Sequence, residues 1–163
     1  MSDVVVDSCQ VTRIGEGIGF TSQIFRAELE YESHLPDAPR TVVIKLPSAD
    51  RTFREQIWHV YEREFRFYES IADGIEMRVP ACYYCARDPD AHQGVLLLKD
   101  FGFARAGDQV VGCSREDAER GTIGLGALHA SRWSVGIDEP PDDGKSKELD
   151  ARRRRLFPQW WTT

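Results

Sequence analysis

Glu64 and Lys45 carry the two side-chain groups of this chain that are best suited to chemistry, a carboxylate and an ammonium. The segment 52–72 predicts one amphipathic helix, because its apolar residues recur at intervals of three and four: Phe53, Ile57, Tyr61, Tyr68 and Ile71. At about 100° per residue, Glu64 points into the centre of this stripe. An ionised carboxylate facing a core is costly unless a cation meets it. We therefore expect Lys45, near the end of the β-branched run 41–46, to pair with Glu64.

The other carboxylates of this helix give the alternatives. Glu55, Glu62 and Glu69 are predicted on the opposite, solvated side, and Glu62 becomes the partner of Lys45 if the helix phase differs. A second interpretation makes Lys45 an ordinary lysine at a strand end and Glu64 an interior carboxylate that other groups satisfy.

A glycine-rich turn precedes the lysine strand. Gly15, Gly17 and Gly19 follow a short predicted strand, 9–14, and lead through Thr21 and Ser22 into a segment of alternating apolar and polar residues, 25–32. The turn therefore opens a strand and makes a hairpin. The glycine motifs of Rossmann and P-loop proteins open a helix instead. A glycine-rich hairpin can lie over phosphates, or it can simply be flexible.

Composition limits the classes of partner. The chain has 163 residues and a net charge of −6, with 41% hydrophobic residues, which suits one domain with a core. The acidic balance argues against nucleic acid and acidic membranes as partners. No apolar run approaches the roughly 20 residues that span a bilayer, and the start lacks the pattern of a signal peptide. We expect a cytoplasmic protein.

Two of the four cysteines, Cys82 and Cys85, have the spacing of a metal ligand pair. Zinc or redox chemistry would need a second such pair, or histidines, and the sequence offers neither. The segment 79–86 is predicted as a strand, on which positions three apart face opposite ways. We expect buried structural thiols and no metal site.

Further elements follow in order. Segments 78–86 and 94–99 predict two strands, and Ser114 and Asp117 have capping-box spacing before a helix that reaches about Trp133. From 136 onward the chain changes to an acidic, proline-containing stretch and then to a basic run, 152–155, beside aromatic residues. This tail is expected to be irregular.

Together these stretches resemble the amino-terminal part of the aminoglycoside phosphotransferase-like family, and most closely its choline-kinase-like and ecdysteroid-kinase-like members. The stretches that carry the resemblance are 15–27, 42–47, 61–68, 79–81, 96–102 and 125–130 with Trp133. The resemblance implies an α+β fold, a protein-kinase-like N-lobe in which one helix packs on an antiparallel sheet of about five strands. It also implies three parts: a nucleotide-binding lobe with hinge (1–102), the first helix of a truncated helical lobe (103–135) and the tail (136–163).

The resemblance also implies roles for individual residues. Lys45 would contact the α- and β-phosphates of ATP, and Glu64 would hold Lys45 in place. The hinge 98–101 would present its backbone to the adenine. The implied ATP-binding residues are Gly15, Gly17, Gly19, Thr21, Ser22, Lys45, Glu64, Leu98, Lys99 and Phe101. Such enzymes use ATP with Mg²⁺ to phosphorylate a hydroxyl of a small molecule.

The catalytic motifs of the family are missing. Phosphoryl transfer needs a carboxylate that orients the acceptor hydroxyl and side chains that hold magnesium. In the family these come from a His-Gly-Asp loop and a later Asp-containing motif, and the sequence contains neither. Asp100, Phe101 and Gly102 spell the magnesium-binding triplet of protein kinases, but they follow a hinge strand with no catalytic loop before them. We name no catalytic or metal-binding residue, and expect an isolated lobe that is inactive alone. The alternative is a non-catalytic kinase-like module that binds a partner protein.

Overall fold

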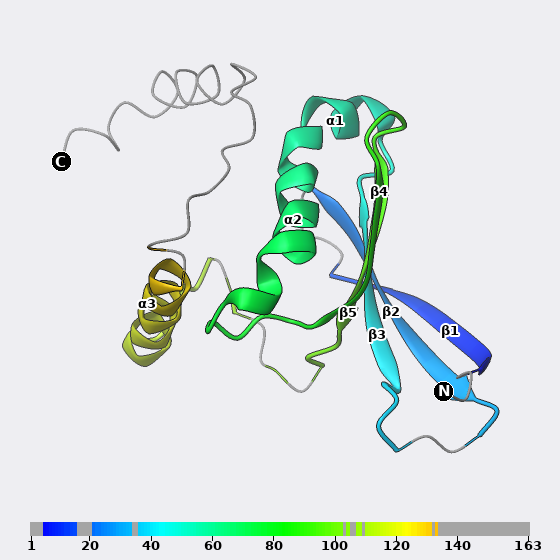
Figure 1. Cartoon of the computed structure of the whole chain (residues 1–163), viewed down its shortest axis with the longest axis horizontal. Helices are drawn as coiled ribbons and strands as arrows, with labels where there is room; N and C mark the ends of the chain where they lie inside the picture. The colour runs from blue at the N-terminus through cyan, green and yellow to red at the C-terminus, as the bar shows by residue number, and fades with distance from the viewer. Residues whose placement is uncertain are drawn as a thin grey trace. The chain divides into compact units, whose positions relative to one another are not determined.

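A computed structural model describes residues 5–15, 21–33, 36–102, 104, 107–108, 110–131 and 133. The described part is α+β (Figure 1). Its elements are β1 (Val6–Ile14), β2 (Ser22–Tyr31), β3 (Thr41–Pro47), α1 (Arg51–Gln56), α2 (Trp58–Ser70), the 3₁₀ turn η1 (Ala72–Gly74), β4 (Cys82–Asp88), β5 (Gln93–Lys99) and α3 (Arg115–Ala130).

All five strands form one antiparallel sheet in the order β1-β2-β3-β5-β4. The expectation of an antiparallel sheet of about five strands is confirmed. Strand β3 lies at its centre, where Lys45 is opposite Ile24 of β2 and Leu96 of β5. Residues directly opposite in antiparallel strands share a face, so these three side chains lie on one side of the sheet.

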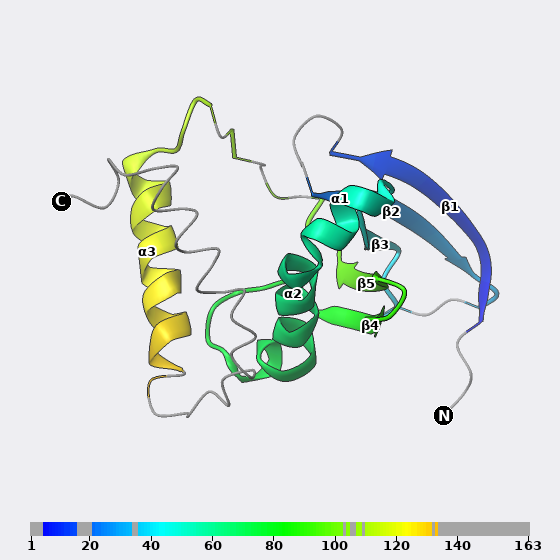
Figure 2. The same ribbon diagram turned by 90° about the horizontal axis from the view of Figure 1, so that it is seen from above.

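Helix α2 packs on that same side (Figures 1 and 2). Its buried residues join two leucines of β5 in one hydrophobic cluster: Trp58, Tyr61, Phe65, Leu96 and Leu98. Aromatic side chains supply most of the buried area, and the ring of Trp58 lies 6.0 Å from that of Tyr61 and 6.1 Å from that of Phe65. This cluster fixes α2 against β4 and β5.

The prediction of one helix over 52–72 is wrong in one respect. The chain forms two helices that meet at Ile57, whose backbone angles (φ −111°, ψ 17°) are not helical. Trp58, the first residue after the break, lies in the core. Its ring packs edge-on against that of His92, with 5.5 Å between the ring centroids. No proline or glycine marks the site, so tertiary packing overrides a locally continuous helical pattern.

The prediction that Cys82 and Cys85 face opposite ways is also wrong. The register of β4 against β5 shifts between Cys82 and Tyr84, which is a β-bulge. Cys82 is consequently opposite Leu98 and Cys85 opposite Leu96, so both thiols pack against the hydrophobic cluster. The strand itself begins at Cys82, later than the predicted position 78, after Pro80, which has no N–H to donate.

Helix α3 begins where the capping-box spacing placed it. The side chain of Ser114 accepts a hydrogen bond from the backbone N–H of Asp117 at 3.1 Å. No residue of α3 is buried. The predicted irregular tail, 136–163, lies outside the described residues, and no described helix is long and apolar enough to cross a membrane.

Candidate functional site

The candidate site is built around the predicted ion pair, which the structure contains. The Nζ atom of Lys45 lies 2.5 Å from Oε1 of Glu64, with the two side chains 26% and 31% exposed. Lys45 is held by the central strand and Glu64 by α2. The expectation that Glu64 points into the centre of the apolar stripe is corrected, because the buried residues of α2 are Trp58, Tyr61 and Phe65, and Glu64 lies beside them. The pair is thus partly open to solvent.

Tyr61, one turn before Glu64, ties α2 to the two neighbouring strands. Its hydroxyl donates to the backbone carbonyl of Thr21 and accepts from the backbone N–H of Ser48 at 3.2 Å. Thr21 immediately precedes β2 and Ser48 immediately follows β3. The apolar pattern of 52–72 predicts Tyr61 only as a core residue. Its polar tip on an apolar stripe was the available signal, because a buried tyrosine hydroxyl usually has a hydrogen-bond partner.

The glycine-rich turn is described in part. Gly15 has φ +70°, a left-handed conformation that favours glycine, and a Cβ there would meet no atom within 4 Å. Gly17 and Gly19 lie outside the described residues. Thr21 and Ser22 lie where β2 begins, and Ser22 is opposite Pro47 at the far end of β3. The turn therefore connects β1 to β2, and β2 runs directly beside the lysine strand.

The predicted hinge, 98–101, begins with the last two residues of β5 and continues past its end. The side chain of Leu98 is buried in the hydrophobic cluster, and the backbone N–H of Lys99 donates to the carbonyl of Ala81 at 2.8 Å. Lys99 is exposed and Phe101 half-buried. Leu98 thus contributes its side chain to the core, Lys99 is still paired with Val42 of β3, and the chain leaves the sheet after Lys99.

Asp100, the first residue of the Asp-Phe-Gly triplet, is engaged by the sheet. Its Oδ2 atom lies 2.6 Å from Nε of Arg26 and its Oδ1 atom 3.3 Å from Nη2. Hydrogen bonds from Arg26, and also from Thr41 and the backbone of Gly102, hold the pKa of Asp100 below its usual value, against the opposing effect of burial. The carboxylate is therefore occupied by protein groups.

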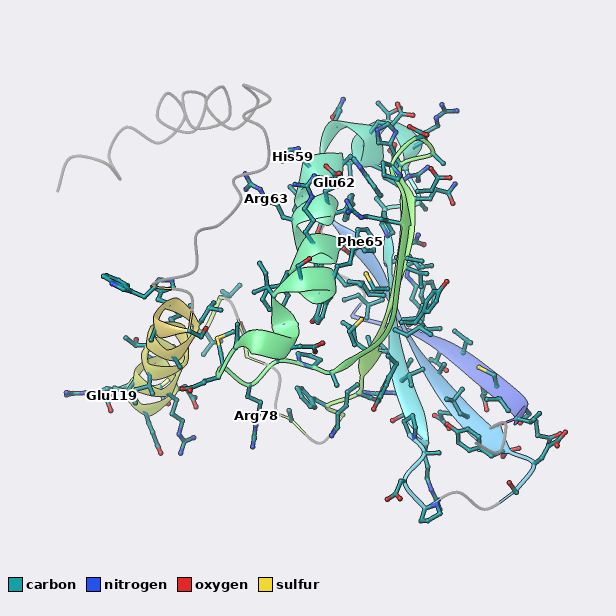
Figure 3. All side chains as sticks on the ribbon, in the orientation of Figure 1. His59, Glu62, Arg63, Phe65, Arg78 and Glu119 are labelled. Atoms are coloured by element: carbon teal, nitrogen blue, oxygen red, sulfur yellow. The ribbon has the colours of Figure 1, made fainter. Side chains whose placement is uncertain are left out.

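The prediction that Glu62 and Glu69 lie on a solvated side is corrected. Both accept from Arg87 of β4, Glu62 at 3.2 Å and Glu69 at 3.0 Å, and they hold α2 to the edge of the sheet. Figure 3 shows Phe65 on the side of α2 that faces the sheet and Arg63 on the other. Glu62 is therefore engaged by Arg87, which leaves Lys45 to Glu64. Glu55 pairs with Arg51 on the surface of α1.

The two cysteines of β4 are thiols in an apolar setting. Burial, with the nearby Glu69 carboxylate, raises the pKa of Cys85 to about 11, and burial also raises that of Cys82. Raised pKa values make both thiols weak nucleophiles at neutral pH. Among the described residues, no group of three or more His, Cys, Asp or Glu side chains is placed to hold a metal ion.

Comparisons with models of known protein families, with curated proteins and with solved structures find no match to this chain.

Proposed function

We propose that the chain forms the nucleotide-binding lobe of a phosphotransferase that acts on a hydroxyl group of a small molecule. The observation that carries the proposal is the contact between Lys45 and Glu64. A lysine on the third strand, held by a glutamate from the helix that follows and preceded by a glycine-rich hairpin, is the arrangement that protein kinases need to bind ATP.

The partial exposure of the pair suits this role. A lysine ammonium has three donor hydrogens, so Lys45 can bond Glu64 and still offer donors to phosphate oxygens. Glu64 keeps the ammonium on the side of β3 that α2 covers. There it lies next to Ile24, which belongs to the glycine-rich hairpin of β1 and β2. Tyr61 supports this placement by fixing α2 to the residue that ends the glycine-rich turn. ATP is the nucleotide that we propose.

The function proposed for these 163 residues is the binding of ATP, without catalysis of phosphoryl transfer by these residues alone. The 163 residues contain no His-Gly-Asp sequence, so no residue is assigned to orient an acceptor hydroxyl. Phosphoryl transfer by a lobe of this kind requires a carboxylate and metal ligands supplied from outside these residues. The small-molecule acceptor belongs to that missing part of the site.

A second candidate function is a non-catalytic module that binds a partner protein. The observation in its favour is α3, on which Ile123 is 72% exposed and Leu125 52% exposed. Such apolar exposure on a helix without buried residues is typical of a surface that another protein covers. This candidate predicts no response to nucleotide.

A thermal-unfolding titration with ATP and Mg²⁺ separates the two functions. A ligand that binds only the folded state adds about 1.4 kcal/mol of stability at ten times its Kd. We expect the wild type to be stabilised and Lys45→Met to show no such gain. Arg87→Met is the matched control, because it removes two ion pairs between α2 and β4, those with Glu62 and Glu69, and should keep a response to ATP. Equal responses of wild type and Lys45→Met would overturn the proposal.

A further inference from the structure

A second ion pair lies on the same face of the sheet as Lys45. Arg26 of β2 is opposite Val43 of β3, which is opposite Leu98 of β5. Arg26 therefore projects on the Lys45 side, one pleat repeat (about 6.8 Å) nearer the start of β3. Its guanidinium reaches across β3 to Asp100, with the two contacts at 2.6 and 3.3 Å.

The ion pair between Arg26 and Asp100, which we call the clamp, holds the segment that follows β5. The side chain of Asp100 is 6% exposed, and that of Arg26 is 36% exposed. A Cβ at Gly102 would lie 3.0 Å from Nη2 of Arg26 and 3.4 Å from Oδ1 of Asp100, so this backbone lies directly against both members of the pair. The ion pair thus joins β2 to residues 100–102.

The clamp and the Lys45–Glu64 pair lie in neighbouring rows of this face, and an apolar strip of two half-buried side chains, Ile24 and Val43, links the rows. Ile24 lies opposite Lys45, and Val43 lies opposite Arg26, beside the buried Leu98. A nucleotide needs cationic and backbone donors for its phosphates, an apolar surface for its ring, and polar backbone groups at the ring edge. Lys45 suits the first of these needs and the strip the second. The third need would fall to the backbone of residues 99–101, in which the N–H of Lys99 already donates to Ala81 and the carbonyl of Phe101 accepts from Ala104.

We propose that Arg26 and Asp100 are positioning residues that hold the backbone of residues 99–101 in place for the base of the nucleotide. This inference rests on the proposed function, since it concerns the same site. It assigns the purine ring to the clamp end of the strip and the phosphates to the Lys45 end. Loss of the clamp should weaken recognition of the base and leave recognition of phosphate in place.

The test compares ATP with inorganic tripolyphosphate, which keeps the phosphates and lacks the base. Both are titrated with Mg²⁺ against the full chain by calorimetry. In Arg26→Met we expect the preference for ATP over tripolyphosphate to fall about tenfold, the size of an impaired hydrogen-bond contact with the base. Asp100→Asn should act in the same direction. Arg26→Lys keeps the positive charge but cannot make the bidentate contact with the Asp100 carboxylate. It is the milder variant to use if Arg26→Met fails to fold.

Arg87→Met serves as the control for loss of an ion pair elsewhere on the sheet, and its ratio of the two affinities should equal that of the wild type. A merely structural role of the clamp would lower both affinities together and leave the ratio unchanged, which would overturn the inference alone. A wild type that binds neither ATP nor tripolyphosphate would overturn the proposed function and this inference with it.

Discussion

The hydroxyl of Tyr61 donates a hydrogen bond to the backbone carbonyl of Thr21, which lies 40 residues earlier in the chain. The same oxygen accepts from the N–H of Ser48. One buried side chain of α2 thus fixes the end of the glycine-rich turn and the exit of the lysine strand. Glu64 lies one turn further along α2, so the position of the acid that meets Lys45 depends on this contact.

Removal of that hydroxyl should destabilise the protein. Tyr61→Phe keeps the ring and leaves the N–H of Ser48 and the carbonyl of Thr21 without this partner, at a cost of about 1–3 kcal/mol. Urea denaturation measures the free energy of unfolding. Tyr84→Phe, at an exposed tyrosine of β4, is the control and should change it by less than about 0.5 kcal/mol. Equal effects of the two substitutions would show that the Tyr61 contact carries no net stability.

The Lys45–Glu64 pair should contribute little to stability. Because both side chains are partly exposed, a double-mutant cycle with Lys45→Met and Glu64→Gln should give a coupling free energy of at most about 1 kcal/mol. The response to ATP should nevertheless be lost in Lys45→Met. A coupling of several kcal/mol would mean that the pair serves mainly the fold.

Gly94 is a position where a larger residue cannot fit. A Cβ there would lie 2.3 Å from Cζ of Phe65 and 2.9 Å from the carbonyl oxygen of Ala86. Gly94→Ala should therefore cost about 1–3 kcal/mol of stability through overpacking. Gly126→Ala in α3 is the contrasting variant, since a Cβ meets nothing within 4 Å there, and it should stabilise the helix by up to about 1 kcal/mol. A neutral Gly94→Ala would contradict the close approach of β5 to α2.

The Arg26–Asp100 clamp predicts a dependence of stability on pH. Hydrogen bonds from Arg26 hold the folded pKa of Asp100 below its ordinary value of 3.8, so the unfolded chain binds the proton more readily. The contribution of Asp100 is present in full above that ordinary value and is lost as the pH falls through the lower folded pKa.

Urea denaturation at a series of acidic pH values checks this dependence. The difference in stability between wild type and Asp100→Asn should be largest at neutral pH and should shrink in strong acid. A difference in the free energy of unfolding that stays constant with pH would show that ionisation of Asp100 contributes nothing to stability.

The pairing of Lys45 with Glu64 could be predicted from the sequence, because Glu64 lies beside the apolar face of one helix, although not at its centre, and Lys45 lies near the end of one strand. The strands and the beginning of α3 follow from local patterns in the same way. Other contacts leave no local signal. Arg26 and Asp100 are 74 residues apart, and nothing near either one indicates its partner.

The errors have a common physical origin. The break at Ile57 arises because the core takes in Trp58, and the bulge before Tyr84 arises from the pairing of β4 with β5. In both places the local sequence is compatible with a regular element, and contacts with distant residues decide the outcome. The helical pattern places Glu62 and Glu69 in solvent, because their partner Arg87 lies on a different element and leaves no signal near them.

Strand β3 has a hydrogen-bonded neighbour on each side, so a shift of its backbone by one residue would disrupt two ladders and turn Lys45 to the opposite face. Glu64 lies on a helix that side-chain contacts hold to the sheet, among them those of Tyr61, Phe65 and Arg87. Backbone ladders therefore set the position of the ammonium, and side-chain packing sets that of the carboxylate. Substitutions in the core beneath α2 should displace Glu64 more than Lys45.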